Sequence, residues 1–426
     1  MLKYLFLGTI IILPLQFALN ISENVDLVVT RILVPAVFLL WLVRSLAKKR
    51  IWIPNRAETW LLLSFLFLAA VSLWGGLNWE KGARKILYLF SIIPIYFVGA
   101  DLARDERFQT KIARAILASG TLAAAVGLIQ FVLPFILGLD ATLGIWKKLA
   151  EFFLGNSFGE LVAQNPSWLV NVSGVTWMRA FGFFPDPHSF SFFVALAMFS
   201  SLGYFVWEKN IAWRVFAGVG ITLMFCSITL SFSRGAYLGT LTGSIFFLLF
   251  VLKRAGKLGK VVLAGAVILS LVAVFFRGPV QGRLVSAFNF REGSNAERMK
   301  NWQQAADIIE NYPLTGIGLG NYSSYVDPMS AERSPIYAHD IFLDLASETG
   351  IAGGAVFLLL LLFGIWRGIS SKKILGLGLA TSLVYFLVHG IFDTPIWSPQ
   401  VMVILLVILA LGLHINNAKC KYQNEK

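Results

Sequence analysis

The sequence predicts an all-α integral membrane protein with about twelve transmembrane helices. Of its 426 residues, 57% are hydrophobic and only 14% are charged, whereas soluble domains carry about 25% charged residues. Many apolar runs approach the roughly 20 residues that a helix needs to cross a bilayer. The basic residues fall mainly in short loops between these runs. This pattern argues against a nucleic-acid-binding protein, which would gather its basic residues on a soluble face.

The apolar runs give the positions of the expected helices. They lie at 2–20, 26–46, 58–76, 85–101, 112–138, 188–207, 212–231, 234–252, 260–277, 349–367, 374–392 and 398–416. The first run lacks a small-x-small cleavage site and is followed by further spans. We therefore expect it to remain as a helix and not to be removed as a signal peptide.

The basic loops predict an orientation, because cytoplasmic loops of membrane proteins are enriched in Lys and Arg. With the N-terminus in the cytoplasm, several strongly basic loops also lie on that side. These loops are 44–50, 103–111, 208–214, 253–260 and 367–373. We therefore expect both termini inside and two long segments, 139–187 and 278–348, outside.

This topology divides the chain into five parts. Residues 1–138 form a five-helix membrane part, 139–187 a first outer loop, 188–277 a four-helix membrane part, 278–348 a second outer loop, and 349–426 a three-helix membrane part with a cytoplasmic tail. Long loops carry function more often than the elements that they connect. We therefore expect the active site at the second outer loop.

Both outer loops contain an amphipathic run. In the second loop, Ser294 and Glu297 have the spacing of a capping box before a helix that ends near Pro313. The Gly-rich turn after it, "GIGLG", lacks the strand and the helix of a phosphate-binding loop. In the first loop, "LGIWKKLAEFFLG" either lies in the membrane interface or packs against the other outer loop.

Arg234 in "LSFSRGAYLG" lies between two apolar runs joined by almost no loop. It is therefore expected at or just below the outer surface of the membrane. A charge at mid-bilayer costs about 2.5–3.5 kcal/mol on insertion scales, which favours a function. The small neighbours Ser231, Ser233 and Gly235 predict space around its guanidinium. The alternative is an interfacial Arg whose head group extends to water.

Two more residues of the second loop are candidates for chemistry. Arg298 lies in the first turn of the expected helix, where a cation opposes the helix dipole. An anionic partner would explain it, and a solvated charge is the alternative. His339 in "SPIYAHD" lies just outside the membrane, and its unperturbed pKa of about 6.5 suits a neutral general base. The alternative is a structural histidine.

Three carboxylates, Asp340, Asp344 and Glu348, recur every four residues along one ridge of a short helix. The spacing fits a solvated face as well as a site. A helical ridge separates such side chains by about 6 Å per turn, whereas hard cations need oxygen ligands that converge on one point. The four histidines and two cysteines also lack zinc-type spacing. We therefore expect no metal site.

Four segments together resemble the superfamily of O-antigen ligases and O-antigen polymerases. They are "SFSRGAYLG", "ERMKNWQQAADIIENYPLTGIGLGNY", "AHDIFLDLASETGIAGG" and "HGIFDTP". Their order and expected side of the membrane match the family across residues 170–416, and the amino-terminal part matches by hydropathy. The resemblance implies a GT-C-like enzyme of the bacterial cytoplasmic membrane, without cofactor or metal. Such an enzyme moves a glycan from undecaprenyl diphosphate to an acceptor on the outer side.

The resemblance also implies roles for single residues. Arg234 and Arg298 match the arginines that bind the donor diphosphate, and His339 matches the essential histidine. Arg179, Asp340 and Glu348 are candidates for supporting roles. The family usually has Asn after the histidine, where this chain has Asp340. The added anion would raise the basicity of His339, or it marks a branch with a different acceptor.

The expected function is that of an inverting, O-antigen ligase-like glycosyltransferase in the assembly of lipopolysaccharide or another surface polysaccharide. Its partners would be the lipid-linked donor and a lipid or glycan acceptor. The alternative is a polymerase of the same superfamily, whose acceptor is a second lipid-linked repeat. A twelve-helix transporter is more distant, because it would show two related halves and polar residues at mid-membrane.

Overall fold

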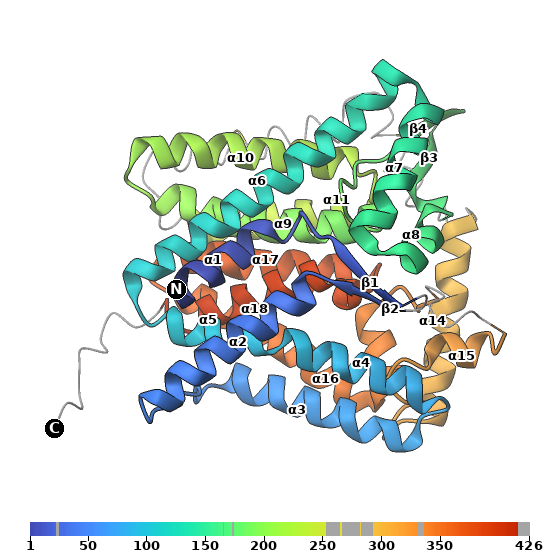
Figure 1. Cartoon of the computed structure of the whole chain (residues 1–426), viewed down its shortest axis with the longest axis horizontal. Coiled ribbons are helices and arrows are strands. Elements are labelled where there is room, and N and C mark those ends of the chain that lie inside the picture. The colour runs from blue at the N-terminus through green and yellow to red at the C-terminus, as the bar shows by residue number, and fades with distance from the viewer. Residues whose placement is uncertain are drawn as a thin grey trace.

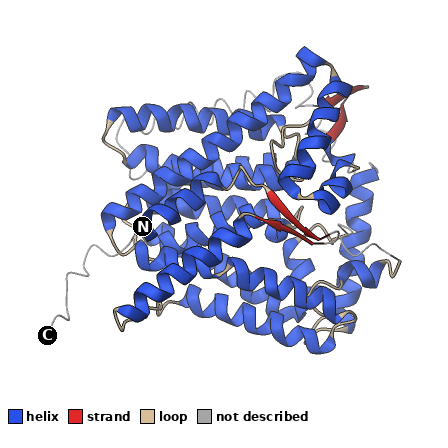
Figure 2. Ribbon diagram, in the orientation of Figure 1, coloured by secondary structure: helices blue, strands red, loops and turns tan. Residues whose placement is uncertain are grey.

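The computed structural model describes residues 1–22, 25–164, 166–172, 174–252, 265, 282, 293–329 and 336–415. Helices dominate these residues, and two short antiparallel hairpins are the strands found among them (Figure 2). The expectation of an all-α, multi-pass membrane protein is confirmed.

Eight helical segments among the described residues are long and apolar enough to cross a membrane. They are α2 (Thr30–Ala47), α3 with the 3-10 turn η1 (Ala57–Val71, Ser72–Gly75), α4 with α5 (Trp79–Ile92, Pro94–Leu102), α6 (Glu106–Leu137), α9 (Pro187–Trp207), α10 (Ile211–Leu230), α11 (Arg234–Val251) and α16 (Ile341–Ser370). Shorter apolar helices are α1 (Leu2–Ile12), α17 (Ile374–Gly390) and α18 (Pro399–Gly412). They correspond to eleven of the expected runs. The remaining run, 260–277, lies outside the described residues apart from Gly265.

The first helix is shorter than the expected run 2–20. Helix α1 ends at Ile12, close to Pro14, which has no backbone N–H to continue the helical ladder. The chain then forms strand β1 (Ala18–Ser22), which pairs antiparallel with β2 (Val25–Val28). At the other end of the sequence, α16 begins before the expected run 349–367. It is interrupted at Gly350, whose φ of +77° is not helical.

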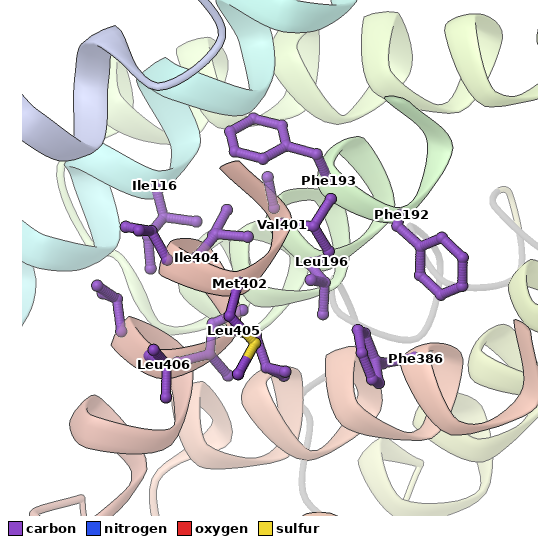
Figure 3. Packing of buried hydrophobic residues seen from close by; sticks show 14 of the residues in the cluster. Ile116, Phe192, Phe193, Leu196, Phe386, Val401, Met402, Ile404, Leu405 and Leu406 are labelled. Carbon is purple, nitrogen blue, oxygen red and sulfur yellow. The ribbon is translucent and has the colours of Figure 1, made fainter. Parts of the chain in front are cut away.

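Helix α9 is the centre of the bundle. All of its residues from 189 to 204 are buried, because α6, α10, α17 and α18 surround it. Figure 3 shows Phe192, Phe193 and Leu196 of α9 among apolar side chains of these neighbours. A Cβ on Gly203 would lie only 2.8 Å from the Cα of Gly378 in α17. Small residues let two membrane helices approach closely, which increases their van der Waals contact.

The elements outside the spans gather at one end of the bundle (Figure 1). They are α7 (Leu139–Leu154), α8 (Asn156–Ala163), η2 (Pro166–Trp168), β3 (Leu169–Val172), β4 (Val175–Met178), α14 (Gly293–Asn311) and α15 (Tyr322–Val326). Ion pairs at the other end join the basic loops: Lys3 to Asp105 at 2.8 Å, and Lys373 to Glu106 at 3.0 Å. These ion pairs thus lie at the end of the bundle opposite α14 and α15. The end that faces the cytoplasm, the number of spans and the five-part division stay predictions.

The amphipathic run of the first outer loop forms α7 and packs within its own loop. Trp146 Nε1 donates a hydrogen bond of 2.7 Å to the carbonyl of Gly182, and the rings of Phe153 and Phe183 stack at 3.9 Å. The aromatic side chains of α7 therefore pack against the segment that leads into α9. Phe152 stays 60% exposed on this helix.

The Gly-rich turn of the second outer loop attaches that loop to the amino-terminal helices. Gly318 has a φ of +91°, and a Cβ there would lie 2.3 Å from the Cα of Gly76. Asn321 Oδ1 accepts a hydrogen bond of 2.7 Å from the N–H of Asn78. The N–H of Leu319 donates to Ser72 Oγ at 3.1 Å. The glycines of this turn thus serve close backbone packing, in agreement with the sequence argument against a phosphate-binding loop.

Candidate active site

Polar side chains from four parts of the chain meet at the end of the bundle that carries α14. His188 belongs to the first turn of α9, and Ser233 caps α11. His339 lies two residues before α16, and Asp393 follows α17, which contributes His389 in its last turn. Three of the four histidines of the sequence therefore converge.

Asp393 joins two of these histidines. Its Oδ2 lies 2.9 Å from Nδ1 of His188, and its Oδ1 lies 3.4 Å from Nδ1 of His339. Burial would raise the pKa of the Asp393 carboxyl, but the two imidazoles outweigh burial and hold that pKa well below its usual range. Asp393 is therefore a carboxylate at neutral pH. It can accept an N–H from both rings.

His339 occupies an uncommon backbone conformation. Its φ is +55°, in the left-handed region that residues other than glycine seldom adopt. Two carboxylates hold this turn. Asp344 Oδ1 accepts the N–H of Ala338 at 2.7 Å, and Asp340 caps α16 by accepting the N–H groups of Phe342 and Leu343. Left-handed residues of this kind cost about 1–3 kcal/mol and persist only where their surroundings hold them.

The pKa of His339 is raised above its usual value of about 6.5. Burial would lower it, but the hydrogen bond and the charge of Asp393 outweigh burial. The charge of Arg298 acts in the opposite direction to that of Asp393 and lowers the pKa of His339. The anion that makes His339 more basic is therefore chiefly Asp393. Asp340 is occupied as a helix cap, and burial raises its own pKa to about 6.

The three carboxylates of the helical ridge are buried and accept hydrogen bonds that hold neighbouring segments together, so they do not form a solvated face. Asp340, Asp344 and Glu348 are all buried. Asp344 accepts a hydrogen bond from Thr394 Oγ1 as well as from Ala338, so it connects the turn of His339 to the residue after Asp393. Glu348 faces elsewhere: its Oε1 accepts the N–H of Tyr322 at 3.2 Å, and Lys85 Nζ lies 3.5 Å away.

Arg234 is the first residue of α11 and is only 8% exposed. The residue before it, Ser233, caps the helix by accepting the N–H of Ala236 at 3.3 Å. The expected space beside it is partly occupied, because a Cβ on Gly235 would lie 2.5 Å from Cδ2 of His389. The small neighbours of Arg234 therefore allow α17 to pack closely against the start of α11.

Arg179 is a buried support for the turn that precedes Arg234. Its Nε donates to the carbonyl of Ser231 at 2.7 Å, and its Nη1 donates to the carbonyl of Ser167 at 3.0 Å. These bonds connect the first outer loop to the start of α11. Through these bonds Arg179 positions the turn before Arg234, and a supporting role in the reaction stays a prediction.

Arg298 lies on α14, and hydrogen bonds hold this helix against the turn that contains His339. Tyr322 donates its hydroxyl to the carbonyl of Asn301 at 2.9 Å, and Asn301 Nδ2 donates to the carbonyl of Tyr337 at 3.3 Å. One turn after Arg298, the ring of Trp302 lies 6.4 Å from that of Phe392. These contacts bring the second outer loop and the end of α17 together around His339.

His389 forms the buried floor of the cluster. Its Nε2 lies 3.3 Å from Ser233 Oγ, and its Nδ1 lies 2.9 Å from the hydroxyl of Tyr385. Its ring stacks on Phe192 at 3.8 Å. Ser233 Oγ also lies 3.1 Å from Nδ1 of His188, so one hydroxyl connects two imidazoles.

The sequence analysis assigned no role to His188, His389 or Asp393. The signal that was available is their position: each lies at the outer end of an apolar run, as His339 does. Among the described residues, no three His, Cys, Asp or Glu side chains are grouped so that they could hold a metal ion.

Comparison with known proteins covers three of the four motifs with a family model. Residues 219–358 match the family model described as O-Antigen ligase. This segment contains Arg234, Arg298 and His339. The chain is also similar to a General O-oligosaccharyltransferase of Acinetobacter baylyi, with 24% identity over 398 residues that cover 84% of this chain and 67% of that protein. The resemblance to the ligase superfamily is confirmed, and a transporter is correspondingly disfavoured.

Proposed function

We propose that this protein, whose residues 219–358 match the O-Antigen ligase family model, is a membrane glycosyltransferase that transfers a glycan from undecaprenyl diphosphate to an acceptor hydroxyl. The reaction would occur on the outer face of the bacterial cytoplasmic membrane. The observation that carries the proposal is the pairing of His339 with the anionic Asp393, in a segment that is hydrogen-bonded to α14, the helix that contains Arg298. A base beside cationic side chains suits a reaction with a nucleophilic hydroxyl and an anionic leaving group.

Arg234 and Arg298 would bind the donor diphosphate. Arg makes bidentate hydrogen bonds to phosphate oxygens and stays charged at every physiological pH. A lipid diphosphate places its anionic group at the membrane interface, and Arg234 stands at the end of an apolar helix. As the bond to the sugar breaks, negative charge increases on the diphosphate. Fixed cations at that position stabilise the transition state.

His339 would act as the general base. Asp393 accepts the Nδ1–H of its imidazole, which leaves Nε2 with the lone pair, as in other carboxylate-histidine pairs. Nε2 would take the proton of the acceptor hydroxyl while its oxygen attacks the anomeric carbon. The bond to the diphosphate breaks on the opposite side, so the sugar anomer inverts. General-base catalysis of this kind contributes about 10²- to 10⁴-fold to the rate.

The acceptor defines two candidate reactions. The family match favours a lipid or glycan hydroxyl, as in a ligase. The similarity to a General O-oligosaccharyltransferase favours a hydroxyl of a protein as the second candidate. Both acceptors would use the same base and the same donor site, because both present a hydroxyl to the anomeric carbon.

The test is transfer from purified undecaprenyl-diphosphate-linked glycan in detergent, with lipid A-core, a second lipid-linked glycan and a Ser-rich protein as separate acceptors. We expect one acceptor to be glycosylated with release of undecaprenyl diphosphate, an inverted anomer by NMR, and a rate unchanged by excess EDTA. A retained anomer, or activity lost in EDTA and restored by magnesium or manganese, would overturn this mechanism.

A further inference from the structure

A polar cavity lies at the end of the bundle opposite the histidine cluster. It opens between the start of α1, the end of α2 and the turn from α5 to α6, at the side of Figure 1 where the N-terminus is marked. Its volume is about 320 Å³, within the range of about 300–1,000 Å³ that is usual for ligand pockets. The cavity shares no lining residue with the proposed active site.

The lining of this cavity is strongly basic. Five cationic side chains and two carboxylates line it, which leaves a net charge of +3. They are Lys3, Arg44, Lys48, Arg50 and Arg104 against Asp101 and Asp105. Such an excess of positive charge favours an anionic ligand over a cation or a neutral sugar.

Both carboxylates are already occupied. Asp105 accepts a hydrogen bond of 2.8 Å from Lys3 and also caps α6. Asp101 accepts from Trp41 Nε1 at 2.9 Å and from Arg104 at 3.4 Å. Among the described residues, the hydrogen-bond partners of these two carboxylates thus do not include the other three basic residues of the lining, Arg44, Lys48 and Arg50.

Arg44, Lys48 and Arg50 are brought together by the end of α2. Arg44 and Lys48 are four residues apart, so they share one face of the helix and repel each other. Lys49 has a φ of +52°, and the N–H of Arg50 donates to the carbonyl of Ser45 at 2.9 Å. This Schellman-type end turns Arg50 back along the helix. In the described part of the chain, none of the three forms an ion pair with a carboxylate.

Two tryptophans identify the level at which the cavity lies. Trp41 and Trp52 line it, and the guanidinium of Arg104 lies 4.8 Å above the ring of Trp52. Tryptophan is enriched where membrane helices meet the lipid head groups, and clusters of Lys and Arg beside such helices attract anionic head groups. We propose that this cavity binds a phosphate group, either of an anionic phospholipid or of a free phosphate, through Arg44, Lys48 and Arg50.

The test uses the full chain purified in neutral detergent at fixed ionic strength. Thermal unfolding is followed as phosphatidylglycerol, phosphatidylcholine or inorganic phosphate is added. The cavity variant is Arg44→Gln/Lys48→Gln/Arg50→Gln. The matched control, Lys147→Gln/Lys148→Gln/Lys209→Gln, removes the same charge from exposed positions outside the cavity.

We expect phosphatidylglycerol, inorganic phosphate or both to raise the Tm of the wild type and of the control. In the cavity variant the half-saturating concentration should rise about tenfold or more, since each basic residue adds to the attraction. Protection by the lipid alone identifies a head-group site, and equal protection by inorganic phosphate identifies a phosphate site. If the triple variant does not fold, the same comparison is made with the single variant Arg44→Gln, whose half-saturating concentration should also rise. A cavity variant that responds like the wild type, or phosphatidylcholine that protects as well as phosphatidylglycerol, would overturn the proposal.

Discussion

At the residue scale, Asp393 is the side chain on which the candidate site depends most. It is the shared partner of His188 and His339, and it raises the pKa of His339 against the effect of burial. A neutral imidazole is needed to accept a proton. The rate of transfer should therefore be full at high pH and fall as the pH drops through the raised pKa of His339.

Replacing Asp393 by Asn tests this dependence. The amide keeps the shape but removes the charge that raises the pKa of His339, so the acid limb of the pH–rate profile should move to lower pH. The imidazole also loses the anion that fixes its tautomer, and we expect turnover to fall by about 10²-fold or more. The measurement is kcat between pH 5 and 9. If the acid limb of Asp393→Asn stays at the wild-type pH, Asp393 does not set the pKa of the general base.

The two arginines make a second residue-scale prediction. Arg234→Ala and Arg298→Ala should remain in the membrane but lose glycan transfer, and Lys should restore it poorly because an ammonium cannot make a bidentate contact. The exposed Arg107→Ala is the control. Transfer at a near wild-type rate by either Ala variant would make that arginine a structural charge.

At the element scale, the start of α16 and the end of α17 are held together by one buried carboxylate. Asp344 accepts hydrogen bonds from Ala338 on one side and Thr394 on the other. His339 and Asp393 are the neighbours of these two residues. The two hydrogen bonds of Asp344 therefore position the base His339 and its partner Asp393 relative to each other.

Asp344→Ala should separate these two segments. The N–H of Ala338 would lose its buried acceptor, which costs about 1–3 kcal/mol of stability. We expect kcat to fall while the KM for the donor changes little, because the arginines belong to other elements. Unfolding and kinetics of Asp344→Ala are compared with the exposed Asp140→Ala. A variant with the stability loss and an unchanged kcat would limit Asp344 to a structural role.

The sequence predicted most helices but not the contacts between their ends. Apolar runs locate α10 and α11 to within a few residues, because Arg234 and its polar neighbours interrupt them. The pairing of His188 with Asp393 joins residues 205 positions apart, and no spacing rule reports such a contact. The burial of Glu348 could not be predicted either, since its partners Tyr322 and Lys85 lie in two other helices, α15 and α4.

At the scale of the whole molecule, the bundle separates two charged ends. The histidine cluster and α14 lie at one end, and the basic cavity lies at the other. The Lys and Arg bias predicts that the cavity end faces the cytoplasm. This orientation would put the proposed donor site at the outer surface, where a lipid-linked glycan would be presented.

The orientation is tested with single cysteines in intact cells. A cysteine at Asp327 lies in the second outer loop, and one at Lys372 lies in a basic loop at the cavity end; both replace polar residues near chain turns. We expect an impermeant thiol reagent to label Asp327→Cys and to spare Lys372→Cys until the membrane is opened. Labelling of Lys372→Cys alone would reverse the topology and place the histidine cluster in the cytoplasm.

The most direct measurement concerns His339 itself, with donor binding and turnover measured separately on purified protein. His339→Asn is the sharpest variant, because Asn tolerates the left-handed backbone of this position but cannot act as a base. We expect binding of the lipid-linked donor to stay close to that of the wild type, while turnover falls by about 10²-fold or more. A His339→Asn or His339→Gln enzyme that turns over at the wild-type rate would contradict general-base catalysis by His339 and remove the mechanism proposed for this site.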